Sequence, residues 1–255
     1  MSLLNDLFYT NKNTFKKTFN LFKNNWLIIF TGLLYTTLNL LLYGFVGLIA
    51  RSILGILSGI VLFIATSAMI SSYLYLLDNI LSREKFDLDD LKEGFKIYLW
   101  KIYGVFFIGW IAKLFASLLL RPMASSYIIS GLFSTIITVL ILILLNPLPE
   151  AIYQKIYSPW ETILYAFDFI KNNWIEWFIP NVIFMGILYL TTGEYLLDIF
   201  TINLSFNFDL SIKGIALYAI GQILFSFIMI YRGVLFKTLS TSTRRKRNFM
   251  RNMYK

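Results

Sequence analysis

The chain of 255 residues is 58% hydrophobic and only 15% charged, with a mean hydropathy of +0.68 and a formal net charge of +9. Soluble domains have about 45–50% apolar and about 25% charged residues, so this composition predicts an integral membrane protein. Cysteine and histidine are both absent, which excludes disulfides, thiol chemistry and the usual zinc sites.

Six apolar stretches are long enough to cross a bilayer core about 30 Å thick, which requires about 20 residues per helix. They cover residues 26–50, 52–80, 99–120, 125–147, 174–199 and 212–236. The first stretch is too long, and starts too far along the chain, for a cleavable signal peptide. We expect an all-α, polytopic integral membrane protein with six transmembrane helices in three hairpins, forming one membrane domain over residues 1–255.

The tetrapeptide Lys-Asn-Asn-Trp occurs twice, at 23–26 and 171–174, and an apolar stretch follows each copy. Apolar residues precede both copies at the same spacing, and a third segment has this spacing without the tetrapeptide. The three sets are Phe15, Phe19 and Phe22; Leu91, Phe95 and Tyr98; and Ile163, Phe167 and Ile170. Their middle residues are 76 and 72 positions apart. Three repeat units are therefore expected, at about 11–80, 87–147 and 159–238.

Each expected unit begins with an amphipathic helix that is too polar to span the membrane and so lies in its interface plane. Residues 158–161 have the form of a capping box with Pro at the first helical position, and Asp87 with Asp90 starts the middle helix. The Asn pair predicts a bend between flat helix and span, since Asn is a poor helix former. The predicted interface anchors are Trp26, Trp100, Trp174, Phe19, Phe95 and Phe167.

The basic residues are distributed asymmetrically about these six stretches. All but four of the 23 Lys and Arg residues fall on one side, and the exceptions are Arg51, Lys113, Arg121 and Lys213. The positive-inside rule then places both termini in the cytoplasm of a multi-pass protein of the cell (inner or plasma) membrane. The distribution favours lipid over nucleic acid as partner. In the basic tail, 239–255, anionic lipid headgroups would contact Arg244, Arg245, Lys246 and Arg247.

Few polar residues interrupt the apolar stretches, and such residues are functional candidates by default. They are Asn39, Lys113, Asn181 and Gln222. Hydrogen bonding between helices is the simpler role for them, and Lys113 is close enough to the outer surface to reach it. No carboxylate is expected near a bilayer centre, which argues against a proton- or sodium-coupled carrier.

Three further features concern packing and chemistry. Gly55 and Gly59 form a GxxxG pattern that continues in small residues, which predicts a central packing role for the second span. Pro180 predicts a kink in the fifth. The acidic group Asp87, Asp89, Asp90 and Glu93 is interpreted as a helix start rather than a metal site. With no P-loop, nucleophile elbow or dinucleotide fingerprint, we expect no enzyme activity and no cofactor.

An amphipathic segment ending in Lys-Asn-Asn-Trp, followed by two spans and repeated, resembles the stand-alone relatives of the membrane domain of glycerophosphoryl diester phosphodiesterases. This broad group includes many uncharacterised bacterial six-helix membrane proteins. Residues 19–26 and 167–174 carry the resemblance, and 91–100 is a degenerate copy. The resemblance implies a membrane domain over nearly the whole chain and transfers no catalytic residue. The family's soluble phosphodiesterase domain is not expected here.

The favoured interpretation is a non-enzymatic membrane scaffold or transport-associated domain, with three hairpins related by rotation about the membrane normal. A permease subunit of an ABC-2-type exporter is an alternative of similar size and span number. Residues 81–97 would then be a coupling helix that docks on a cytoplasmic ATPase, and 199–211 the outer loop. Such permeases need no amphipathic helix before the fifth span. A self-immunity protein against a membrane-active peptide is a third interpretation, which the basic face allows.

Overall fold

The structure, a computed structural model, describes residues 3–50, 55–120, 127–194, 196, 198–204, 211–243, 246, 247, 249 and 253. Its regular elements in these ranges are all helices. Within these described ranges, six helical segments are long and apolar enough to cross a membrane. They are Trp26–Ala50, Leu57–Ser82, Leu99–Leu118, Thr135–Gln154, Pro159–Thr192 and Ile212–Thr241. The expected number of membrane-spanning helices is therefore confirmed by length and composition.

Most elements follow one another with short connections. In chain order the elements are α1 (Leu3–Asn24), the 3-10 helix η1 (Trp26–Phe30), α2 (Thr31–Ala50), α3 (Gly55–Ser82), α4 (Leu88–Ile97), α5 (Leu99–Leu120), α6 (Tyr127–Leu144), α7 (Leu148–Gln154), α8 (Pro159–Thr192) and α9 (Ile212–Thr241). The connection between α8 and α9 is longer and runs from residue 193 to 211.

The boundaries of the fourth and fifth spans differ from those expected. The fourth is divided, because α6 ends at Leu144 and the short helix α7 starts after Pro147. The fifth ends at Gly193 rather than at residue 199. Gly193 has a φ of 73°, a left-handed conformation that glycine adopts at little cost and that ends many helices.

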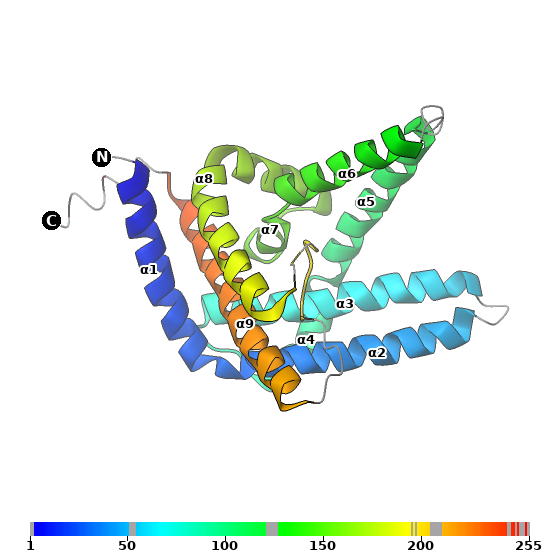
Figure 1. Cartoon of the computed structure of the whole chain (residues 1–255), viewed down its shortest axis with the longest axis horizontal. Coiled ribbons are helices and arrows are strands. Elements are labelled where there is room, and N and C mark those ends of the chain that lie inside the picture. The colour runs from blue at the N-terminus through cyan, green and yellow to red at the C-terminus, as the bar shows by residue number, and fades with distance from the viewer. Residues whose placement is uncertain are drawn as a thin grey trace.

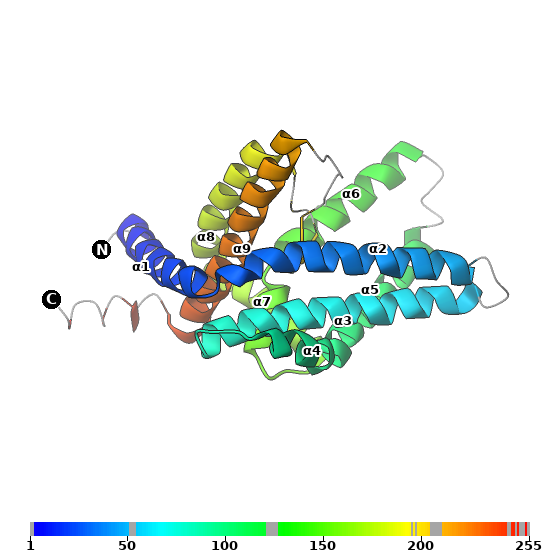
Figure 2. The ribbon, with the colours of Figure 1, turned by 90° about the horizontal axis from the view of Figure 1, so that it is seen from below.

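The long helices diverge from a common base, which is the region where α3 packs against α4, α7 and α9 (Figures 1 and 2). α2 packs along α3, and α8 along α9, as two helical hairpins. The expected third hairpin is more open: α5 packs against α3 and α8, and α6 against α8, with no comparable contact between α5 and α6 among the described residues. The spans therefore diverge and do not pack against one another over their whole length.

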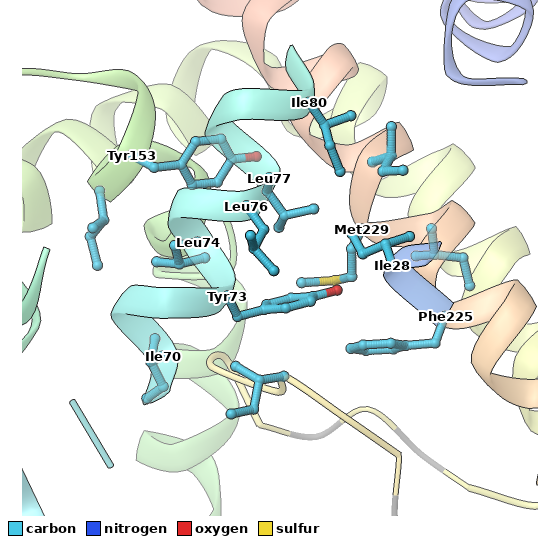
Figure 3. Packing of buried hydrophobic residues seen from close by; sticks show 14 of the residues in the cluster. Ile28, Ile70, Tyr73, Leu74, Leu76, Leu77, Ile80, Tyr153, Phe225 and Met229 are labelled. Carbon is cyan, nitrogen blue, oxygen red and sulfur yellow. The ribbon is translucent and has the colours of Figure 1, made fainter. Parts of the chain in front are cut away.

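The hydrophobic core lies at the base. There α3 contacts α2, α4, α5, α7 and α9, which agrees with the central role expected of the second span. Tyr73 of α3 stacks on Phe225 of α9 with ring centres 6.1 Å apart, and Ile28 and Met229 pack beside them (Figure 3). In the GxxxG pattern, a Cβ added at Gly59 would meet nothing within 4 Å, whereas one at Gly55 would lie 3.0 Å from the Ala50 carbonyl oxygen, so Gly59 does not pack on a neighbouring helix.

The buried fraction differs steeply from one span to another. In the most apolar part of the second span 56% of residues are buried, against 6% in the first and 11% in the third. In lipid there is no hydrophobic force between helices, so spans associate only where small or polar groups let them approach closely. Such groups, including Ser67, Ser71 and Ser72, are buried near the base.

Each tetrapeptide copy bends the chain at its second Asn. Asn25 (φ −125°, ψ 33°) separates α1 from η1, and Asn173 (φ −133°, ψ 17°) interrupts α8. Each side-chain amide donates to the carbonyl four residues earlier, Leu21 at 2.8 Å and Phe169 at 3.0 Å. These bonds give a donor to carbonyls that lose their helical N–H partner at the break. Pro180 keeps helical dihedral angles, and the break inside α8 is the one at the Asn pair.

The middle unit bends differently. Its non-helical residue is Tyr98 (φ −106°, ψ 3°), at the C-terminus of α4, and the Tyr98 N–H donates to Ser71 Oγ at 2.8 Å. In the spacing shared by the three segments, Tyr98 corresponds to Phe22 and Ile170, three residues before the two Asn bends. The middle segment therefore bends earlier and is held by α3 instead of by its own side chain.

The residues expected at the interface are mostly on the surface. Trp26, Trp100 and Trp174 are 54%, 72% and 58% exposed. Phe19 and Phe167 are also exposed, whereas Phe95 packs against the core. The helix α1 turns a different face to the protein: Thr10, Thr14 and Thr18 are buried, on a helix that packs against α9.

Candidate functional site: a buried ion pair at the base

Two deeply buried charges, Glu150 and Arg232, form an ion pair. The Arg232 side chain on α9 is 6% exposed and the Glu150 side chain on α7 is 2% exposed. Arg232 Nε donates to Glu150 Oε1 at 2.6 Å, and one terminal nitrogen, Nη2, donates to Oε2 at 3.1 Å. This two-point geometry is the strong form of an arginine–carboxylate pair.

Neighbouring groups complete the pair. The same Nη2 donates to the Asn146 carbonyl at 2.8 Å, and the guanidinium lies 5.2 Å from the ring centre of Trp177 on α8. Trp177 is fully buried, and its Nε1 donates to Asn146 Oδ1 at 2.9 Å. The cluster thus joins α7, α8 and α9 through the connection between α6 and α7. Buried charges need partners of this kind, because an unpaired one is costly in a medium of low dielectric constant.

A cavity of about 260 Å³ adjoins the cluster on the side away from the base. Arg232 and Asn146 form part of its wall, together with apolar residues of α6, α8 and α9. The connection between α8 and α9 covers it, with Asp198 and Thr201 in the lining. This connection folds inward: Ile202 and Leu204 are buried, and Asn203 Nδ2 donates to Thr36 Oγ1 on α2 at 2.9 Å.

The geometry favours a structural role for the ion pair rather than a catalytic one. Both Glu150 oxygens accept hydrogen bonds from one guanidinium, so neither is free to take a proton from a bound molecule. Within the described ranges, no group of three Asp, Glu, His or Cys side chains is arranged to hold a metal ion. What the cluster can do is fix the relative positions of three helices.

Two of the four expected intramembrane polar residues take part in packing. Asn181 is 1% exposed and donates to the Trp177 carbonyl at 2.7 Å, within its own helix. Gln222 is 2% exposed, donates to Tyr218 Oη at 3.1 Å, and packs on Gly32, where an added Cβ would collide with it. Lys113 is exposed and Asn39 half-buried, and neither lies in the Glu150–Arg232 cluster.

The basic tail differs in part from its expected position on lipid headgroups. Arg247 Nη2 lies 3.3 Å from Asp6 of α1 and 3.7 Å from Glu176 of α8, and its side chain is only 11% exposed. The Asp6 side chain is 4% exposed and that of Glu176 13%, so Arg247 ties the C-terminal segment to the fold. Lys246 is exposed, as expected, whereas Arg244 and Arg245 lie outside the described residues.

The acidic side chains at the start of α4 make a capping hydrogen bond and a local ion pair. The Asp87 N–H donates to Asp90 Oδ2 at 2.8 Å, as in a capping box, and Lys85 Nζ lies 3.3 Å from Asp87 Oδ1. At the start of α8, the Ser158 N–H donates to Glu161 Oε2 at 2.9 Å and Ser158 Oγ accepts from the Glu161 N–H. Both helix starts predicted from the sequence are confirmed.

Sequence reasoning missed the ion pair. Arg232 is one of the basic residues on the side expected to be cytoplasmic, and Glu150 lies just after the expected fourth stretch, 125–147. The available signal was a lone arginine inside an apolar segment, with Val234, Leu235 and Phe236 after it. An ionisable residue in that position needs a partner, but Asp78, Glu150 and Asp198 all lie near the ends of other spans, so the sequence does not single out Glu150.

Comparison with known proteins gives no assignment: no family model matches the chain, and neither a curated protein nor a solved structure matches it.

Proposed function

We propose that this chain is a non-enzymatic, multi-pass protein of the cell membrane that acts as a membrane scaffold or transport-associated domain, with both termini in the cytoplasm. The observation that carries this proposal is the contrast between a tightly connected base and widely exposed apolar spans. Such exposed side chains are stable only in lipid or against another membrane protein. A rigid base fixes where these surfaces point.

The local geometry supports a relation between the first and third of the expected units within this scaffold. The two Asn bends share nearly the same dihedral angles and the same side-chain hydrogen bond. In each, an exposed Trp follows directly at the start of a span. We infer that the flat segments before Trp26, Trp100 and Trp174 form a collar in the cytoplasmic interface, which satisfies their polar and apolar faces at once.

The exporter-permease alternative receives less support from the position of α4. Ser71 Oγ donates to the Gly94 carbonyl, and Ser72 Oγ donates to that of Leu91 at 2.9 Å. An added Cβ at Gly94 would lie 2.9 Å from Ser72 Cα, so α4 is in close contact with α3. A helix held in this way is a part of the base and is poorly suited to act as a separate docking element.

Cysteine labelling tests the proposed topology without background, because the natural chain has no cysteine. Single substitutions Glu84→Cys, Ser158→Cys and Thr241→Cys should react only with reagents that enter the cytoplasm. Lys213→Cys, and Met123→Cys in the part outside the described residues, should react from outside. External labelling at Ser158 would contradict both the topology and the repeated units. Hydrolysis of ATP or glycerophosphodiesters by the purified protein would contradict the non-enzymatic role.

A further inference from the structure

A second cavity lies at the base, and neither Glu150 nor Arg232 lines it. It has a volume of about 590 Å³ and is half open to the surroundings. The ends of α3, α5, α7 and α9 surround it, and three lysines but only one aspartate line it. These are Lys101, Lys155, Lys237 and Asp78. The size is typical of a small-molecule site, and the charge balance favours an anion.

The lysines have few partners of opposite charge. Lys101 Nζ donates to the carbonyls of Ile152 and Lys155 at 2.8 Å and 2.7 Å, at the end of α7. Lys237 Nζ makes one long bond, 3.4 Å, to the Leu81 carbonyl. Neither lysine forms an ion pair with a carboxylate in the described part of the chain. A cation placed among neutral acceptors is better compensated when an anion joins it.

Several acceptors in the cavity already have a donor. Tyr98 Oη donates to Asp78 Oδ2 at 2.8 Å. Burial raises the pKa of the Tyr98 hydroxyl, and the adjacent Asp78 carboxylate raises it further, so the phenol stays protonated and keeps this bond. One Asp78 oxygen is bonded to Tyr98, and Lys101 bonds the Ile152 and Lys155 carbonyls, so the three lysine side chains outnumber the acceptors left to meet a ligand. A metal cation is therefore poorly suited to the cavity.

Apolar groups at the rim indicate where the ligand comes from. Ile156, on the connection between α7 and α8, is fully exposed, and Tyr157 beside it is 42% exposed. Trp100, adjacent to Lys101 in the chain, is also exposed. Exposed Trp, Tyr and Ile beside lysines are typical of the depth at which lipid headgroups lie. A smaller hollow of about 270 Å³ shares Leu81, Lys237 and Thr241 with the cavity and adds Lys17.

We propose that this cavity binds the phosphate of an anionic lipid headgroup, with Lys101 and Lys237 as its main contacts. Basic pockets between spans on the cytoplasmic side of membrane proteins bind such headgroups. The location on that side rests on the topology proposed above, whereas the binding itself depends only on the residues of the cavity. The ligand chemistry is a phosphate ester, and its alternative source is free phosphate.

Native mass spectrometry of the purified protein in detergent measures this binding directly. Wild-type protein should retain phosphatidylglycerol or cardiolipin in preference to phosphatidylcholine. Lys237→Gln should weaken retention about fivefold, the effect of one surface charge, and Lys101→Gln/Lys237→Gln should weaken it further. The matched control Lys16→Gln/Lys92→Gln removes two exposed lysines from the flat helices and should leave retention unchanged.

The outcomes separate the possible explanations. Equal losses in the cavity and control variants, or no loss in either, would overturn the proposal. Displacement of the lipid by millimolar inorganic phosphate, with wild-type protein retaining phosphate itself, would identify free phosphate as the ligand. If the double variant fails to fold, Lys237→Gln alone decides, because that side chain makes one long hydrogen bond. Cysteine labelling tests the topology separately, so a wrong topology is distinguishable from an empty cavity.

Discussion

Removing one partner of the Glu150–Arg232 pair should destabilise the base strongly. Glu150→Gln keeps the shape of the side chain but leaves a guanidinium that is 6% exposed without its counter-charge. Two hydrogen bonds to a charged group, at 2.6 Å and 3.1 Å, are affected, and each contributes about 1.5–3 kcal/mol. Breaking a buried pair from one side costs about 3–5 kcal/mol, so we expect a loss of that size in the free energy of unfolding.

The double-mutant cycle makes this test specific. Glu150→Gln/Arg232→Gln should cost less than the sum of the single changes, with a coupling energy of about 2 kcal/mol. Unfolding by sodium dodecyl sulfate in mixed micelles, followed by tryptophan fluorescence, provides the measurement. Arg83→Gln is the control, since Arg83 is 63% exposed and lies 3.8 Å from Asp90, and it should cost at most about 1 kcal/mol. Additive single changes, or a cost below about 1 kcal/mol for Glu150→Gln, would refute the reasoning.

Two further predictions use the same unfolding measurement. Asn25→Ala should lower the free energy of unfolding by about 1–3 kcal/mol, because the buried Asn25 amide also bonds the Glu84 carbonyl and the Phe86 N–H. Asn173→Ala removes one hydrogen bond and should lower it by less. Equal costs would show that the contacts to residues 84–86 add nothing. Gly94→Ala should cost about 1–3 kcal/mol through collision with α3, while Gly59→Ala, in open space, should be neutral or stabilising by up to about 1 kcal/mol. A harmless Gly94→Ala would contradict the close contact of α4 with α3.

Local signals in the sequence were sufficient for several elements. Ser158 and Glu161 specify a helix start through groups three residues apart, so no distant contact was needed to predict it. Asn25 and Asn173 bend the chain with bonds to carbonyls only four residues away, and the repeated tetrapeptide indicated both positions. Six apolar stretches likewise predicted six membrane-spanning helices, because the required length is set by the bilayer rather than by the fold.

Contacts between distant segments decided the rest. Glu150 and Arg232 are 82 positions apart, and Asp6 and Arg247 are 241 apart, so no spacing in the sequence could pair them. The divergence of the spans could not be predicted from the sequence either, because an apolar helix in lipid has the same composition whether a neighbouring helix or a lipid chain covers it. The sequence by itself determined the membrane class, the helix starts and the bends, because these depend on composition and on neighbours within one turn. Only the tertiary structure decided which charges meet and where the helices separate, because burial and ion pairing depend on side chains brought together from different helices.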